Sequence, residues 1–174
     1  LSQFVFRWGL ALAIPLFPIY WVRNLHASDQ MVSVINSTTT FVTMIAYFAW
    51  ARISQRRGRR PVLLIASLGI CFYPLLTALT PRPEILPLWA GMAGLFSAGI
   101  ELVFFDVLVG VCPRDQQAAY VGIYQTTVYI ATFLAPLLGT ALSDLIGIAP
   151  VLVLATAIRL VGFGMIARLG VGKG

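Results

Sequence analysis

Two carboxylates lie inside long apolar runs of the chain, where ionisable side chains are costly and usually functional. Glu101 follows the stretch LFSAGI, and a carboxyl group held in hydrocarbon is desolvated, which favours proton binding. Asp106 lies about a turn and a half further along, and we expect it nearer the membrane interface. Both are candidates for proton coupling, with Glu101 the stronger one. The alternative for both is a carboxylate held in an ion pair or hydrogen-bonded to the main chain.

An arginine, Arg159, lies near the middle of another apolar run, VLVLATAIRLVGFGMIARL. Arginine at this depth is expensive even when its side chain reaches toward the interface, so we expect an acidic partner. Glu101 and Asp106 are the candidate partners, which makes Arg159 our candidate for an intramembrane ion pair. Arg7 lies about one turn from the end of the first run, and we expect its side chain to reach the interface.

Polar residues in three of the runs recur at the spacing of one helix face. They are Ser33, Asn36, Thr40 and Thr43 in one run, Gly94, Ser97 and Glu101 in a second, and Gln125, Tyr129 and Thr132 in a third. Such faces either line a cavity or form close helix contacts with cross-helix hydrogen bonds. The candidate residues of a solute cavity are Asn36, Thr40, Thr43, Ser97, Glu101, Gln125 and Tyr129.

The composition is that of a membrane protein. The 174 residues are 59% hydrophobic and 10% charged, against roughly one quarter charged in soluble domains. Six apolar spans, each near the length that crosses a bilayer as a helix, occupy residues 3–23, 30–51, 60–79, 86–111, 117–142 and 149–169. The spans lack the period-two alternation of a membrane barrel. The sequence therefore predicts an all-α membrane protein in which residues 1–174 form one bundle of six transmembrane helices.

Two further features bear on function. Pro15 and Pro18 interrupt the first span, which predicts either a kink that builds a site or hinge, or a tolerated break. The sole histidine, His26, lies at the end of that span, and no phosphate-binding glycine pattern is present. We therefore expect no enzyme activity, no cofactor and no metal site.

The stretch WARISQRRGRR at residues 50–60 places five arginines between two apolar spans. With six crossings the joints alternate sides, and one side then collects most of the basic residues: Arg52, Arg56, Arg57, Arg59, Arg60, Arg114, Arg168 and Lys173. The other side holds only Arg23 and Arg82. The positive-inside rule makes the first side cytoplasmic, together with both termini. Topology thus accounts for the net charge of +6, and no nucleic acid partner is expected.

The order of residues in this stretch resembles a family motif. Residues 51–60, ARISQRRGRR, resemble the G-x-x-x-D-R-x-G-R-R loop of the major facilitator superfamily, which joins the second and third helices of each six-helix repeat. The joint from Pro113 to Val121 and the stretch PLLGTALSD at 136–144 resemble the carboxy-terminal repeat. The resemblance covers essentially the whole chain and implies one repeat, half of a 12-helix transporter.

The resemblance also assigns roles and carries two departures. It implies a gating loop formed by Gln55, Arg56, Gly58, Arg59 and Arg60. Ala51 replaces the motif's glycine, and Gln55 replaces an aspartate that is thought to hold one conformational state together, so we expect a weakened latch. The family places the first, second, fourth and fifth helices around the cavity, in agreement with the polar faces. It places the sixth outside, which favours a structural pairing of Arg159 over solute binding.

We therefore expect a secondary active transporter that moves a small solute across the plasma membrane by alternating access, with proton coupling through Glu101 or Asp106. The expected partners are the lipid bilayer, the solute, and either an amino-terminal six-helix half outside this chain or a second copy in a homodimer of halves. The alternative is a non-transporting membrane scaffold or assembly factor of the same fold that binds partner subunits, with which Gln55 and the short chain are compatible.

Overall fold

The computed structural model describes residues 2–111 and 116–168, and every regular element over these residues is a helix. The elements are α1 (Ser2–Ala13), α2 (Leu16–Arg23), α3 (Asp29–Arg57), α4 (Arg59–Leu79), the short 3-10 helix η1 (Pro83–Ile85), α5 (Leu86–Val111), α6 (Gln117–Ile146) and α7 (Ile148–Arg168). Six helical segments among the described residues are long and apolar enough to cross a membrane, with α1 and α2 together forming the first. The predicted fold class, an all-α protein with six transmembrane helices, is confirmed.

The first span is broken where Pro15 interrupts it. The N–H of Ile14 donates to the Ala11 carbonyl at 3.2 Å, one residue closer than an α-helix requires, because Pro15 has no N–H to offer that carbonyl. α1 consequently ends at Ala13, and α2 starts at Leu16. Pro18 lies in the first turn of α2, where its missing N–H breaks no intrahelical bond.

Local chemistry explains where the other helices begin and end. The hydroxyl of Ser28 accepts a hydrogen bond from the Met31 N–H at 3.3 Å and so caps the start of α3. Gly58, with φ of +87°, separates α3 from α4, a backbone conformation that glycine adopts without steric cost. α3 therefore extends to Arg57, beyond the predicted span end at residue 51, and the first arginines of the loop are helical.

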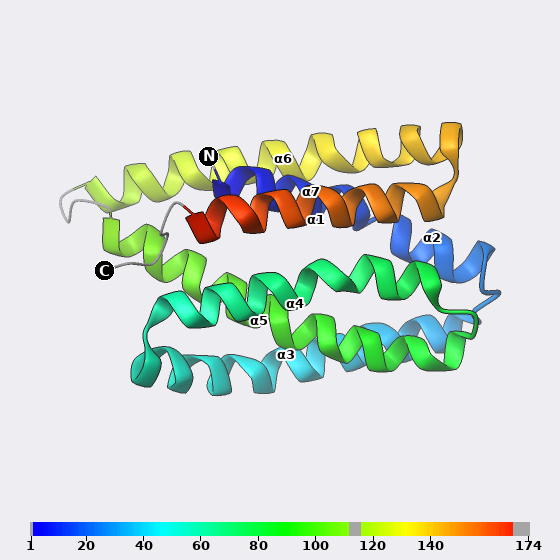
Figure 1. Cartoon of the computed structure of the whole chain (residues 1–174), viewed down its shortest axis with the longest axis horizontal. Helices are drawn as coiled ribbons and strands as arrows, with labels where there is room; N and C mark the ends of the chain where they lie inside the picture. Colours follow the sequence, from blue (N-terminus) through cyan, green and yellow to red (C-terminus); the bar gives the residue numbers. More distant parts are fainter. Residues whose placement is uncertain (1, 112–115, 169–174) are drawn as a thin grey trace.

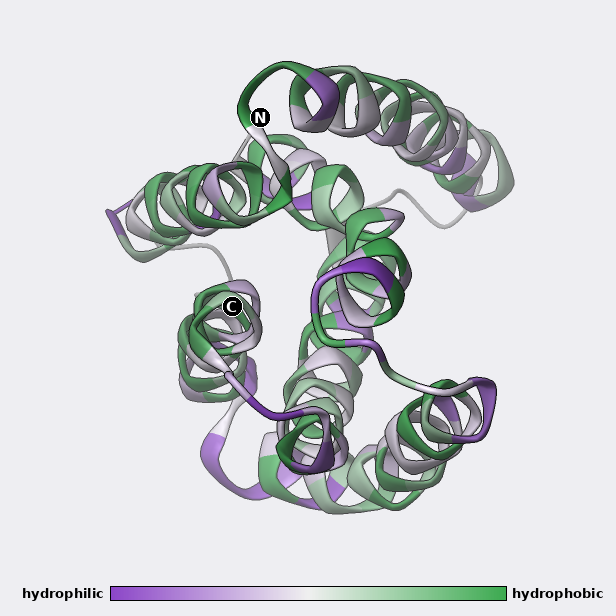
Figure 2. Cartoon of the chain, turned by 90° about the vertical axis from the view of Figure 1, so that its right-hand side faces the viewer, coloured by the Kyte–Doolittle hydropathy of each residue, from purple (hydrophilic) through white to green (hydrophobic). Residues whose placement is uncertain are grey.

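The six spans form two groups of three, α3 with α4 and α5, and the broken helix α1 and α2 with α6 and α7, joined mainly where α4 packs against α7 (Figure 1). Glycines allow the closest approaches within the groups. A Cβ on Gly94 of α5 would lie 2.5 Å from the Thr39 carbonyl oxygen of α3, and a Cβ on Gly139 of α6 would meet the Leu12 carbonyl of α1. Figure 2 views the bundle along its helices, with hydrophilic residues mainly at helix ends and in loops.

One end of the bundle carries most of the positive charge. The start of α1, the turn between α3 and α4, and the end of α7 all lie on the left in Figure 1. We call this the arginine-rich end, defined by Arg52, Arg56, Arg57, Arg59, Arg60 and Arg168. Arg23 is the last residue of α2, and Arg82 directly precedes η1. Both lie at the opposite end of the bundle. Arg114, Lys173 and Pro113 fall outside the described residues.

Two helices are much less covered than the rest. In the most apolar stretch of each span, only 11% of the residues of α3 and 17% of those of α6 are buried, against 33 to 50% in the other spans. Large apolar side chains such as Phe41 and Phe48 on α3 and Phe133 on α6 are exposed. The outward faces of these two helices are therefore available to lipid or to another helical bundle.

Candidate solute cavity

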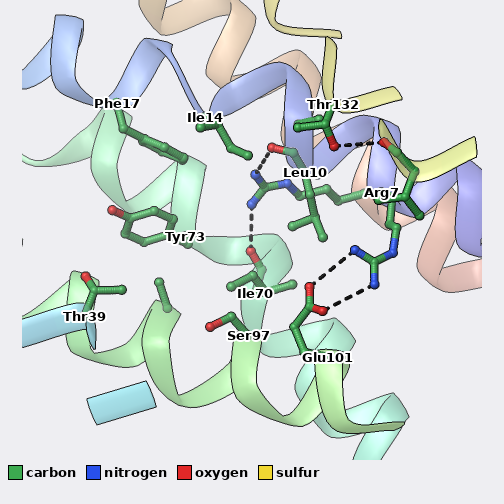
Figure 3. Close-up of a pocket in the computed structure, with 14 residues that line it drawn as sticks. Arg7, Leu10, Ile14, Phe17, Thr39, Ile70, Tyr73, Ser97, Glu101 and Thr132 are labelled. Atoms are coloured by element: carbon green, nitrogen blue, oxygen red, sulfur yellow. Dashed lines mark hydrogen bonds and ion pairs between the residues drawn. The ribbon is translucent and has the colours of Figure 1, made fainter. Parts of the chain in front are cut away.

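A cavity of about 270 Å³ lies between the two helix groups (Figure 3). Apolar and aromatic side chains make up most of its wall, among them Leu10, Ile14, Phe17, Ile70 and Tyr73. The polar groups that reach it are Arg7, Thr39, Ser97, Glu101, Thr132 and Arg159. A concave, mostly apolar space with a few convergent polar groups is the usual form of a site for small organic molecules.

An ion pair between α1 and α5 stands at one side of this cavity. Arg7 donates from Nη1 to Glu101 Oε1 at 3.3 Å and from Nη2 to Oε2 at 3.4 Å, and Figure 3 shows the two side chains pointing at each other. The Nε of Arg7 donates to the Tyr124 hydroxyl of α6 at 3.1 Å, and the guanidinium lies 5.3 Å from the Phe104 ring centre. One arginine thus connects three helices through charge, hydrogen bond and ring face.

The partner of Glu101 corrects one expectation. Arg7 does not reach toward the membrane interface; its side chain turns sideways into the bundle, because a carboxylate and two rings are available there. The Glu101 side chain keeps 50% of its surface exposed, while that of Arg7 keeps 17%. Glu101 lines the cavity and is therefore accessible from it.

A second ion pair lies at the arginine-rich end. Arg59, the first residue of α4, donates from Nε to Asp106 Oδ2 of α5 at 3.2 Å. Both side chains are almost half exposed. Gln55 and Arg56 are exposed at the end of α3, and Arg60 is partly buried. Asp106 is thus paired with an arginine of the predicted gating loop.

Arg159 has no acidic partner among the described residues, which corrects the expected pairing with Glu101 or Asp106. Its side chain is 2% exposed and donates three hydrogen bonds, all to main-chain carbonyls. Nε donates to Gly9 at 3.1 Å, Nη1 to Ile70 at 3.1 Å, and Nη2 to Leu10 at 3.4 Å. The two carboxylates are already paired with other arginines, and α7 lies where α1 and α4 offer these carbonyls.

Comparison with known proteins identifies the family. The family model described as Major Facilitator Superfamily matches residues 1–171, nearly the whole chain. The chain belongs to the major facilitator superfamily. As a member with six apolar helices long enough to span a bilayer, it is a multi-pass membrane protein.

Individual major facilitator proteins are similar at low identity. The staphyloferrin B transporter of Staphylococcus aureus (strain NCTC 8325 / PS 47) is 27% identical over 161 residues, covering 87% of this chain and 37% of that protein. The multidrug resistance protein MdtG of Proteus mirabilis (strain HI4320) is 23% identical, covering 89% of this chain and 39% of that protein. The multi-drug resistance efflux pump PmrA of Streptococcus pneumoniae (strain ATCC BAA-255 / R6) is 26% identical, covering 84% and 37%. The chain thus spans less than two fifths of these relatives, and none of the three names describes an enzyme.

The structure separates the predicted cavity residues of this major facilitator chain into three sets. Ser97 and Glu101 line the cavity. The hydroxyl of Thr43 donates to the carbonyls of Thr39 at 2.7 Å and Gly94 at 3.2 Å, within the contact between α3 and α5, and Thr43 is not part of the wall of this cavity. Four residues are exposed on α3 and α6 outside the wall of this cavity: Asn36, Thr40, Gln125 and Tyr129.

Several residues of the cavity wall are not predicted by the sequence pattern. Thr39 was missed because it lies one position off the polar face of its span, and Phe17 and Tyr73 because aromatic residues in apolar runs carry no distinguishing signal. Arg7 did carry a signal, since an arginine inside the first apolar span faces the same cost as Glu101 in the fourth. Opposite charges on two spans that the major facilitator family places around its cavity could have been paired from the sequence.

Proposed function

We propose that this chain is one six-helix half, the carboxy-terminal one, of a secondary transporter that moves small organic solutes by alternating access. The observation that carries the proposal is the cavity between the two helix groups, with the Arg7–Glu101 pair on its wall. Family membership supports transport as the activity, and two of the similar proteins are named as a transporter and an efflux pump. In such proteins two helical repeats rock about a site at mid-membrane depth.

The Arg7–Glu101 pair supplies a switch for this cycle. It joins α1 of one helix group to α5 of the other, next to the solute space. A proton on Glu101 neutralises the carboxylate and weakens the bidentate pair, leaving Arg7 with Tyr124 and the ring of Phe104. Proton uptake then changes the relative free energy of two arrangements of the groups, which is the requirement for coupling.

The arginine-rich end supplies topology and a gate. We propose that it faces the cytoplasm in the plasma membrane, with residues 2 and 168 on the same side, since basic loop residues favour that side. The Arg59–Asp106 pair fastens the start of α4 to α5 there. Gln55 brings no charge to this end, so the pair acts with a weaker latch than the family motif implies.

A second helical unit completes the cavity in this proposal. Only 11% and 17% of the residues in the most apolar stretches of α3 and α6 are buried, and both helices carry exposed polar residues: Asn36, Thr40, Gln125 and Tyr129. A second six-helix unit, an amino-terminal half or a second copy, would cover these faces and enclose the solute. The intact mass of the native polypeptide distinguishes the two: a mass near twice 19.0 kDa indicates a covalently joined half, and 19.0 kDa indicates a homodimer of halves.

The test is transport by the native polypeptide in proteoliposomes with an imposed pH gradient. Ethidium, a lipophilic cation, and carboxyfluorescein, an anion, serve as probes of opposite charge. We expect movement of at least one dye that depends on the gradient, and a fall of about tenfold in the Glu101→Gln variant. Glu84→Gln is the matched control, since Glu84 is an exposed acid in η1 at the opposite end, and its rate is expected to stay unchanged.

Two results would contradict parts of this proposal. Undiminished, gradient-dependent transport by Glu101→Gln would show that Glu101 is not the coupling group. Failure to move either dye, together with a stoichiometric partner subunit that co-purifies from the native membrane, would favour the non-transporting scaffold.

A further inference from the structure

The buried guanidinium of Arg159 donates to three carbonyls, and two of them, those of Ile70 and Leu10, lack their regular main-chain donors because of nearby prolines. In an α-helix the carbonyl of one residue accepts from the N–H four residues later. Ile70 lies four residues before Pro74, which stands inside the continuous helix α4 and has no N–H. The Ile70 carbonyl therefore lacks its helical donor, and Arg159 Nη1 donates to it at 3.1 Å.

The Leu10 carbonyl is in the same position for a related reason. Its regular donor, the Ile14 N–H, donates instead to Ala11, whose own donor is missing because residue 15 is proline. Arg159 Nη2 donates to the Leu10 carbonyl at 3.4 Å, and Nε donates to the neighbouring carbonyl of Gly9 at 3.1 Å. One side chain of α7 thus donates to a carbonyl in α1 and to a carbonyl in α4 that each lack a main-chain donor, and we call each such carbonyl a gap.

Such gaps are costly at membrane depth. In hydrocarbon no water is present to donate to such a carbonyl. Membrane helices therefore tolerate proline only when neighbouring groups satisfy the freed carbonyls. Arginine suits two gaps on different helices because its planar fork carries five donors at fixed angles. The carbonyl dipoles in turn offset part of the cost of burying a charge for which the described residues provide no acid.

A glycine in α1, Gly9, leaves room for this side chain. A Cβ on Gly9 would lie 3.1 Å from Arg159 Cγ and 3.0 Å from Ile158 Cγ2, so a larger residue would press on the stem of the arginine. Arg159, Ile70 and Leu10 all reach the wall of the cavity. The side chain therefore holds α1, α4 and α7 together directly behind that wall.

We propose that Arg159 is a positioning residue that replaces the main-chain donor removed by Pro74 and the one diverted by Pro15, and so fixes the break in the first span and the cavity wall. This role does not depend on an acid, on a solute or on transport. It requires that Arg159 contributes less to the stability of the fold when a missing N–H is restored.

The test is a double-mutant cycle on the native polypeptide in detergent, read as the midpoint temperature of unfolding. Arg159→Met keeps the length of the side chain and removes all donors, and we expect it to lower the midpoint. Pro74→Ala restores an N–H that can reach Ile70, so in that background the fall caused by Arg159→Met should be about half as large, since one of two gaps is closed. Pro136→Ala in α6 is the matched control, because its freed carbonyl belongs to Thr132, whereas Arg159 donates to the carbonyls of other residues; there the two effects should add.

Hydrogen–deuterium exchange separates this positioning role from general packing. Loss of the donors should speed exchange in peptides that cover residues 9–16 and 68–78, with α6 unchanged. If Arg159→Met does not fold alone, folding rescued by Pro74→Ala and not by Pro136→Ala supports the role. If neither background folds, Arg159→Lys, which keeps the charge but loses the fork, is carried through the same cycle.

Three outcomes would overturn the proposal. The first is a midpoint unchanged or raised by Arg159→Met, which would show that the donors are dispensable. The second is an equal fall with and without Pro74→Ala, in whichever Arg159 variant folds. The third is coupling of Arg159 to an acidic residue elsewhere in the polypeptide, with none to Pro74, which would make it an ordinary ion-pair partner.

Discussion

Removing either member of the Arg7–Glu101 pair should have unequal effects on stability. Arg7→Met loses several interactions at once: the bidentate pair with Glu101, the bond to the Tyr124 hydroxyl and the contacts with the rings of Phe104 and Tyr124. Glu101→Gln loses only the charge, because Arg7 keeps Tyr124 and Phe104 and an amide oxygen can still accept one hydrogen bond.

The magnitudes follow from exposure and contacts. Exposed ion pairs contribute about 0.2 to 1 kcal/mol and breaking a buried one costs about 3 to 5. With side chains 50% and 17% exposed, the Arg7–Glu101 pair belongs near the lower range, at about 1 kcal/mol. A hydrogen bond adds about 1 kcal/mol and a cation–ring contact about 0.5 to 1. We therefore expect a loss of about 1 kcal/mol for Glu101→Gln and about 2.5 kcal/mol for Arg7→Met.

The assay is a cycle of the two single variants and the double variant, unfolded reversibly in mixed micelles by increasing the fraction of SDS. The expected coupling free energy between the two sites is about 1 kcal/mol, and it should shrink in about 1 M salt because Glu101 is half exposed. Tyr124→Phe is the matched control, since it removes the hydroxyl and keeps the ring. A coupling free energy of zero, or a larger loss for Glu101→Gln than for Arg7→Met, would refute the assignment of Arg7 as the centre of this cluster.

Three further predictions follow from local geometry. Arg59→Gln and Asp106→Asn should each lower the free energy of unfolding by less than about 1 kcal/mol, since both side chains are nearly half exposed. If the pair acts as a gate, each variant should nevertheless change the rate of dye transport in proteoliposomes. Gly139→Ala should destabilise by about 1 to 3 kcal/mol because α1 and α6 must separate, whereas Gly122→Ala, with open space around it, should not, as measured in the same unfolding assay. Gly58→Ala should cost about 1 to 3 kcal/mol through its φ of +87° alone, since nothing lies within 4 Å of the added carbon; an unchanged midpoint of unfolding would contradict this.

The fold was predictable because a bilayer leaves few choices. A chain that crosses hydrocarbon must satisfy its main chain within each crossing, so apolar runs of the right length predict helices directly. Where a helix ends is set by other rules. Hydropathy falls at residue 51, but the hydrogen bonds of α3 continue to Arg57 because Gly58 is the first residue that breaks the helical conformation.

The site was less predictable, because a helical period predicts which residues share one face of a helix but not which other helix packs against that face. Ser97 and Thr43 both lie on predicted polar faces, and both hydroxyls donate to the carbonyl of Gly94. Ser97 nevertheless lines the cavity, whereas Thr43 makes its bond across the contact between α3 and α5. Counting charges suggested an acid for Arg159. Its acceptors are main-chain carbonyls, which the identities of the side chains do not reveal. The Ile70 carbonyl becomes available to Arg159 only because α4 packs against α7.

The two ends of the described chain, residues 2 and 168, lie at the same end of the bundle (Figure 1). An even number of crossings returns the polypeptide to the side from which it started. A tandem duplication of the coding sequence would therefore give a second unit that inserts with the same orientation as the first, needing only a linker outside the bilayer. The two units would be related by an axis along the membrane normal. Had the unit contained five or seven crossings, the same duplication would have produced an upside-down copy, and its arginine-rich end would lie on the opposite face of the membrane.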